Sequence, residues 1–408
     1  MDPVIYFDNN ATTRLAPEAL EAMGPYLAEL YGNPSSIHRF GSQVGRAIQQ
    51  AREETAALLG AADPVEVIFT SCGTEADNAA IRGILEARPD KRHIVTTQVE
   101  HPAVLALCQH LEKKGYRVTW LGVDGEGMLD LDELRDALTE ETALVSIMYA
   151  NNETGVIFPI EAIGEIVKAK GIPVHVDAVQ VAGKIPLDLK KSAVDLLTIS
   201  AHKFHGPKGV GGLYVRRGIT FRPFIIGGHQ ERNRRGGTEN VAGIVGMGKA
   251  ADIAVKHLGE EGKKVRALRD QLEQSLLAAC PSCRVNGDRE KRIPNTLNVS
   301  CKFLEGEAVL VLLDQHGICA STGSACTAGS AEPSHVLRAM GVEPDWIQGA
   351  IRFSLSRYNT EEEVRFVADR VPSIVERLQD LSALGKLAGG QEALRSDSMA
   401  RERVRARR

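Results

Sequence analysis

The sequence contains no apolar run that approaches the roughly 18 residues of a membrane-spanning helix. Its first residues carry no basic segment, so we expect neither a membrane anchor nor a secretory signal. An excess of one charge is also lacking, since 49 Lys and Arg oppose 53 Asp and Glu, and this balance implies neither a nucleic-acid partner nor a membrane surface. Cysteines number 7, an odd count in no dense disulfide framework, which favours a reduced cytoplasm.

Short apolar segments alternate with helical patterns from residue 65 onward. Seven of these segments are predicted strands: Val65–Thr70, His93–Thr97, Arg117–Leu121, Ala143–Tyr149, Pro173–Asp177, Asp195–Ser200 and Gly211–Val215. Helical patterns lie between most of them, at 74–87, 102–114, 131–139 and 160–170. This alternation predicts an α/β fold with a mostly parallel seven-stranded sheet and helices on both faces. In such sheets ligands bind at the carboxyl ends of the strands.

The length of 408 residues suggests more than one domain. A long polar helix is predicted at 248–279, followed by a smaller α+β section at about 284–380. We therefore predict a large domain at 15–260 and a small domain made of 1–14 and 261–382. Residues 383–408 are rich in Gly, Ser and Arg and are expected to form a disordered basic tail.

Lys203 follows the apolar run that ends at Ser200, so it is expected just beyond the carboxyl end of a strand. A desolvated lysine there can lose its proton and form a Schiff base. Asp177 ends another predicted strand, where a buried carboxylate needs a cationic partner such as a protonated pyridine nitrogen. Taken singly, each residue has an alternative interpretation: Lys203 as a surface lysine, and Asp177 as a helix cap or a salt-bridge partner.

A strand-to-helix turn at residues 69–76 contains Gly73 and Thr74. Backbone N–H groups at a helix start bind anions, and glycine allows close approach, so this turn is a candidate phosphate site. Simple helix capping by Thr74 is the alternative.

These stretches, in this order, resemble the cysteine desulfurases, which are pyridoxal-phosphate enzymes of fold type I, and most closely the nitrogen-fixation (NifS-like) branch. The resemblance extends from about residue 4 to about residue 382. Its motifs are YFDNNATT (6–13), GNPSS (32–36), VEHP (99–102), ANNE (150–153), HKFHGPKG (202–209), RGGTEN (235–240) and GSAC (323–326).

The resemblance implies a role for each matching residue. Lys203 would be the Schiff-base lysine, Asp177 the partner of the pyridine nitrogen, Gln180 a donor to the ring hydroxyl, and His101 the imidazole stacked on the ring. The phosphate ligands would be Gly73, Thr74, Ser200 and His202, with Thr238 from the other subunit of a homodimer. Asn152 and Arg352, with Asn33 nearby, would bind the substrate carboxylate, for which a guanidinium is well suited. A helix cap for His101 and a surface ion pair for Arg352 are the alternatives.

Cys326 lies in a small, polar, Gly-rich segment that predicts a mobile and accessible loop. The resemblance implies that it is the nucleophile that takes sulfur from L-cysteine as a persulfide and leaves L-alanine. The sulfur would be delivered to an iron–sulfur scaffold protein, with nitrogenase maturation as a candidate role. No resident metal is expected, although Cys326 is a candidate transient cluster ligand. Cys280 and Cys283 are interpreted as loop residues, and Cys108, Cys301 and Cys319 as core residues. A selenocysteine lyase, an aminotransferase and a non-catalytic scaffold are the competing interpretations.

Overall fold

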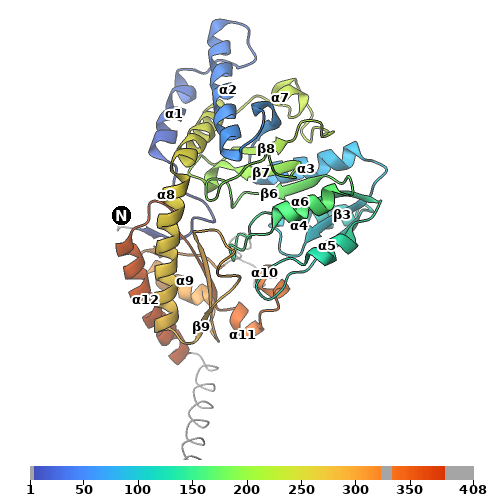
Figure 1. Cartoon of the computed structure of the whole chain (residues 1–408). Coiled ribbons are helices and arrows are strands. Elements are labelled where there is room, and N and C mark those ends of the chain that lie inside the picture. The colour runs from blue at the N-terminus through green and yellow to red at the C-terminus, as the bar shows by residue number, and fades with distance from the viewer. Residues whose placement is uncertain (1–3, 323–332, 382–408) are drawn as a thin grey trace, which may run out of the picture.

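The computed structural model describes residues 4–322 and 333–381. Cys326 and its predicted loop, together with the predicted tail at 383–408, lie outside the described residues. Figure 1 shows a sheet covered by helices in one part of the chain and a smaller group of strands and helices beside it.

The central sheet has seven strands in the order β2-β8-β7-β6-β5-β3-β4. Their bounds are Val67–Thr70 (β2), His93–Thr97 (β3), Arg117–Leu121 (β4), Thr142–Met148 (β5), Val174–Asp177 (β6), Leu196–Ser200 (β7) and Gly211–Val215 (β8). Only β8 runs against its neighbours, with its register set by pairs such as Ile199 with Gly212. The predicted mostly parallel seven-stranded sheet is therefore confirmed.

Alternation along the strands explains why both faces of the sheet are covered. Ile94 packs into one core with α3 (Gly73–Ala87) and α4 (Pro102–Glu112), whereas Val95 packs into another core with α5 (Leu131–Ala137) and α6 (Ile160–Lys168). Neighbouring residues of a strand point to opposite faces, so an all-apolar strand needs helices on both sides.

Several boundaries differ from the prediction, and a local cap explains three of them. Val65 belongs to a 3₁₀ turn, η1 (Pro64–Glu66), which a reciprocal capping box between Asp63 and Glu66 stabilises, so the strand begins later. The N-cap of α3 is Cys72, whose Sγ accepts from Glu75 N, and not Thr74. The long helix α8 (Val241–Ala279) begins well before residue 248, because the Asn240 side chain accepts from Gly243 N and caps it.

The smaller part of the chain is built from two small sheets and flanking helices. One sheet has the antiparallel order β12 (Ala350–Ser354), β10 (Thr296–Cys301), β9 (Cys283–Val285), and β1 (Ile5–Tyr6) pairs in parallel with β11 (Ile318–Cys319). The helices here are α9 (Gly306–Asp314), α10 (His335–Ala339), α11 (Pro344–Ile347) and α12 (Glu361–Leu381). The remaining helices, α1 (Pro17–Ala28), α2 (Arg39–Leu59) and the short α7 (Gln230–Asn233), lie on the side of the central sheet.

Helix α8 connects the two parts, running from α1 and α2 to α12 (Figure 1). Its residues up to Ala254 pack into the core of the central sheet, and those from Val265 pack into the second core, which also contains Phe7. Val336 and Leu337, however, pack into the first core. The division at residue 260 therefore stays a prediction.

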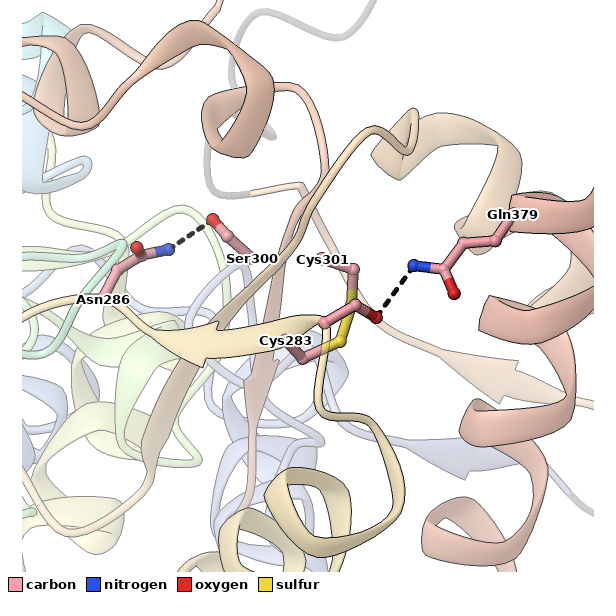
Figure 2. Close-up of a disulfide and its surroundings, with 6 residues drawn as sticks. Cys283, Asn286, Ser300, Cys301 and Gln379 are labelled. Atoms are coloured by element: carbon pink, nitrogen blue, oxygen red, sulfur yellow. Dashed lines mark hydrogen bonds between the residues drawn. A yellow bond between two sulfur atoms is a disulfide. The ribbon is translucent and has the colours of Figure 1, made fainter. Parts of the chain in front are cut away.

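The second core contains a disulfide between Cys283 and Cys301, neighbours across β9 and β10 (Figure 2). Cys283 opens a strand, so its interpretation as a loop residue is wrong, and Cys301 is cross-linked rather than merely packed. The two cysteines lie 18 residues apart, and their Cα atoms are 4.2 Å apart. Sequence spacing alone could not reveal this pair, because the pairing of β9 with β10 sets it. Beside it, Gln379 of α12 donates to Ser282 Oγ at 2.8 Å.

Replacing both Cys283 and Cys301 by Ser is expected to lower the free energy of unfolding by about 3 kcal/mol, the chain-entropy estimate for a loop of this length. Chemical denaturation of non-reduced protein measures the loss. The same comparison in reductant is the control, because the wild type then loses the cross-link too. An equal difference with and without reductant would show that the loss comes from packing and not from a disulfide.

Candidate active site

Most of the predicted site residues line one cavity of about 230 Å³ at the carboxyl ends of the parallel strands. This volume is several times the roughly 30 Å³ that one water molecule takes up in the liquid. Nine predicted residues line it: Gly73, Thr74, His101, Asn152, Asp177, Gln180, Ser200, His202 and Lys203. They come from segments far apart in the sequence, which the parallel strands bring to one edge of the sheet.

Lys203 lies in the single 3₁₀ turn η2 (Ala201–Lys203) that follows β7. Its Nζ donates to the main-chain oxygens of Asn10 at 2.5 Å and Ala11 at 2.9 Å. The amine is thus held at the cavity wall by the segment that precedes α1.

Asp177 is the last residue of β6, and its Oδ1 accepts from Val179 N at 2.9 Å. Burial raises the pKa of Asp177 to about 6, against the opposing effects of that hydrogen bond and of Lys203. Burial, together with Asp177, also holds the pKa of Asp77 in α3 well above its usual value. A cation beside Asp177 would lower its pKa, so this acidic wall suits a protonated pyridine nitrogen.

His101 immediately precedes α4 and caps it, since its Nδ1 accepts from Ala103 N at 3.2 Å. The pKa of His101 is lowered to about 4, mainly by burial and to a smaller extent by Lys203 and His335. The ring is therefore neutral near pH 7, with its proton on Nε2. The helix-cap alternative and a role in the cavity hold together here, because one ring nitrogen caps the helix while the ring lines the cavity.

Another part of the cavity wall, called the phosphate wall below, combines a helix start with small polar side chains. A Cβ on Gly73 would lie 2.9 Å from Val179 Cγ2, so a larger residue would crowd the start of α3. Among the described residues, the buried Ser200 Oγ has no hydrogen-bond partner. An unsatisfied buried hydroxyl is costly, and a phosphate oxygen at the helix start would satisfy it. His202 completes this wall, with Nδ1 3.1 Å from Thr12 Oγ1.

Gln180 follows Asp177 by three residues and is almost fully buried. Its Nε2 donates one hydrogen to Asn10 O at 3.0 Å, and its Oε1 accepts from Lys184 Nζ at 2.9 Å. An amide nitrogen carries two hydrogens, so a second donor remains for a group in the cavity. Together, the acidic wall, the helix start and this amide fit a phosphorylated pyridine cofactor.

Arg352 comes from β12 of the smaller sheet and is 2% exposed. Its Nη1 donates to Asn152 O at 2.9 Å, and its Nη2 lies 2.8 Å from Asp8 Oδ1. The guanidinium therefore lies next to Asn152 at the junction of the two parts of the chain, in a buried ion pair rather than a surface one. Its partner Asp8 was not among the predicted site residues, although it lies in the YFDNNATT motif.

Besides Arg352, two predicted residues in the described part of the chain, Thr238 and Asn33, do not line this cavity. Thr238 lines a separate cavity with Ser71 and Arg235. Asn33 is exposed, and its Oδ1 accepts from Ser35 N at 2.9 Å.

The segment that contains Cys326 is attached on both sides next to this site. On one side, Ser321 and Arg352 exchange two main-chain hydrogen bonds, Ser321 N to Arg352 O at 3.1 Å and Arg352 N to Ser321 O at 2.6 Å. On the other side, Ser334 Oγ donates to Glu153 Oε2 at 2.5 Å. Glu153 directly follows Asn152, so both attachment points adjoin the pair formed by Asn152 and Arg352.

Glu100, beside His101, is fully buried and accepts through Oε1 from Met148 N at 2.9 Å and from Thr97 Oγ1 at 2.8 Å. Burial raises its pKa from 4.5 to about 8. Between these two values the folded state holds a proton that the unfolded state has lost, so this group makes stability fall as pH rises, by about 1.4 kcal/mol per pH unit.

The Glu100→Gln variant removes this titration, because glutamine stays neutral. We expect its melting temperature, measured relative to wild type, to rise between pH 5.5 and pH 8 and to level off at higher pH. Thermal unfolding of both proteins across this range measures the difference, in which all other titrating groups cancel. A difference that stays constant with pH would show that Glu100 has an ordinary pKa.

No helix in the described parts of the chain is long and apolar enough to cross a membrane. Within residues 4–322 and 333–381, no group of three or more His, Cys, Asp or Glu side chains could hold a metal ion.

Comparison with known proteins relates this site to one family. Residues 5–367 match the family described as aminotransferase class-V. A cysteine desulfurase of Trichormus azollae is 62% identical over 379 residues, which cover 93% of this chain and 94% of the relative. The cysteine desulfurase NifS of Azotobacter vinelandii is 52% identical over 93% of this chain and 94% of its own. A solved structure of a NifS-like protein superimposes with a TM-score of 0.87 at 44% identity, covering 92% of this chain and all of that one.

Proposed function

Because this chain belongs to the cysteine desulfurases of the class-V aminotransferase family, we propose that it binds pyridoxal 5'-phosphate and transfers sulfur from L-cysteine to Cys326. Lys203 would hold the cofactor covalently, and Asp177 would pair with its ring nitrogen. The start of α3 at Gly73 and Thr74, with Ser200 and His202, would hold the phosphate. Gln180 would donate its second amide hydrogen to the ring hydroxyl.

When bound, pyridoxal phosphate withdraws electrons from the α-carbon of an amino acid joined to it and makes the α-proton acidic. Lys203 is the proposed base for that proton, since its Nζ lies at the cavity wall within reach of a bound substrate. His101 is the proposed group for proton handling near the substrate sulfur, because its ring lines the cavity and carries a proton on Nε2 while Nδ1 caps α4.

Arg352 and Asn152 would bind the substrate carboxylate, in keeping with the bidentate geometry of a guanidinium. Asp8 orients Arg352 through one of its terminal nitrogens. Asn33 lies outside the cavity, so it would join this group when the exposed segment around it approaches the site.

One observation carries the assignment of Cys326: the chain on both sides of its segment is hydrogen-bonded beside Arg352 and Asn152. Cys326 follows Thr322 by four positions, a length of chain that spans at most about 14 Å. This chain length, together with the two attachment points, supports a Cys326 thiol that can reach the proposed carboxylate site. In the proposed step, its thiolate attacks the sulfur of L-cysteine. A sulfur–sulfur bond forms, the carbon–sulfur bond breaks, and protonation of that carbon yields L-alanine.

The test is incubation of purified protein with L-cysteine in the absence of reductant. Intact mass and peptide mapping should show one added sulfur on the peptide that contains Cys326, with alanine in solution. Alanine and free sulfide without added sulfur on that peptide would instead favour a lyase that uses no protein persulfide. Formation of a keto acid would favour an aminotransferase.

We also propose a homodimer in which Thr238 completes the phosphate site of the other subunit. The location of Thr238 in a separate cavity supports this, because it does not reach the phosphate wall of its own chain. The same segment exposes Ile226, with 84% of its surface accessible, as expected for a contact with a second copy.

An iron–sulfur scaffold protein is the proposed sulfur acceptor, and the 52% identity with NifS of Azotobacter vinelandii supports a role in nitrogenase maturation. We further propose a cytoplasmic location, from the small number of cysteines. The Cys283–Cys301 disulfide argues against a fully reduced state. Alkylation of free thiols in rapidly acid-quenched cells would show whether Cys283 and Cys301 are reduced or linked inside the cell.

A further inference from the structure

Lys184 has no part in the function proposed above, yet it lies beside the residues that perform it. It follows Gln180 by four residues in the turn after β6. Its Nζ donates to Gln180 Oε1 at 2.9 Å and to Asn10 Oδ1 at 3.2 Å. Asn10 contacts the proposed catalytic Lys203, and Gln180 lines the proposed cofactor pocket.

Asn10 is the centre of this hydrogen-bond network and is 1% exposed. Its main-chain oxygen accepts from Lys203 Nζ at 2.5 Å and from Gln180 Nε2 at 3.0 Å. Its side-chain nitrogen donates to Thr296 Oγ1 at 2.8 Å and to Asn152 O at 3.2 Å. One residue thus links the amine of Lys203 to the proposed carboxylate site, and Lys184 holds its side-chain oxygen.

Lys203 also lines a second, smaller cavity of about 50 Å³, whose wall includes Lys184 and Asn295. Asn295 Nδ2 donates to the same Asn10 Oδ1 at 2.9 Å. Lys184 does not line the larger cavity. Its hydrogen bonds to the site go to Asn10 and Gln180.

We propose that Lys184 is a positioning residue for Lys203: by holding Asn10 and Gln180 it fixes the oxygen that orients the Lys203 amine and places positive potential beside it. This inference rests on the proposed function, since it requires Lys203 to carry the cofactor.

The electrostatics of the pocket agree with this role. The pKa of Lys184 is held well below its usual value, mainly by burial and to a smaller extent by the positive charges of Lys203 and Arg352. Whether charged or neutral, the amine directs N–H bonds at Asn10 and Gln180, and the positive ends of these bonds disfavour a proton on a neighbouring nitrogen. The other titratable and charged groups around the two lysines are Asp177 (β6), His101 (start of α4), His202 and His205 (in and after η2), Arg352 (β12), Arg357 (after β12) and Glu261 (α8).

The test is a pH titration of the visible absorbance band of cofactor-loaded protein, which reports the protonation of the nitrogen that joins Lys203 to the cofactor. In Lys184→Met, which keeps the chain length but removes the amine, the midpoint should rise by about half a pH unit or more. Turnover should fall about fivefold with little change in KM for L-cysteine, because the substrate contacts remain. Lys190→Met is the matched control, since Lys190 is exposed six residues further along and should leave both values unchanged.

An unchanged midpoint in folded, yellow Lys184→Met protein overturns the inference, even if its turnover is reduced. If that variant does not fold, Lys184→Ala, which removes the amine and leaves space for water, is titrated in the same way and should show the same upward shift. A wild-type protein without the visible band would contradict the proposed function instead, and this is seen before any variants are compared.

Discussion

Replacing Cys326 by Ala is expected to abolish the formation of both alanine and bound sulfur while leaving the cofactor spectrum unchanged. The thiolate of Cys326 is the proposed nucleophile, and loss of a nucleophile lowers turnover by roughly three orders of magnitude or more. Cofactor binding should persist, because every proposed cofactor ligand lies outside the Cys326 segment. Single-turnover incubation with L-cysteine, followed by alanine quantification and intact mass, measures the loss.

Cys319→Ala is the control for this experiment. Cys319 is half-buried at the end of β11, only seven residues from Cys326, and burial raises the pKa of its thiol, which makes it a poor nucleophile. This variant should retain activity and the added sulfur. Wild-type rates of alanine formation in Cys326→Ala would remove the cysteine from the mechanism and favour a lyase.

Replacing Lys203 by Ala is expected to eliminate the visible band that depends on the covalent bond to the cofactor, and to lower turnover by roughly four orders of magnitude or more. The lysine would supply both the covalent attachment and the base for the α-proton, so a single substitution removes two functions. Absorbance spectra and alanine formation measure these losses. Borohydride reduction of the wild type should lock the cofactor onto the peptide that contains Lys203.

Lys208→Ala is the matched control, because Lys208 is exposed and follows in the same Gly-rich stretch. It should leave the spectrum and the rate unchanged. Cofactor mass on the Lys208 peptide after borohydride, or a normal visible band in folded Lys203→Ala, would show that the lysine assignment is wrong.

Local sequence patterns predicted the strands of the central sheet and the edge of the sheet at which the site lies. Each of the seven predicted strands is present, because apolar runs bounded by helical segments report burial directly, and strand ends such as Ser200 and Asp177 identified where the site would lie. Its motifs also identified the family, since short runs such as HKFHGPKG keep residue type and spacing together.

Tertiary structure alone decided the contacts between distant segments. Asp8 forms an ion pair with Arg352, and Cys283 is linked to Cys301 by a disulfide. Asn10 accepts hydrogen bonds from Lys203, Gln180 and Lys184. Neither 3.6-residue nor 2-residue periodicity carries information about such pairs. They depend on how β1 pairs with β11, on how β10 pairs with β9 and β12, and on how the two parts of the chain meet. The sequence therefore determined the elements and the residue types of the site, whereas packing determined which of those residues touch.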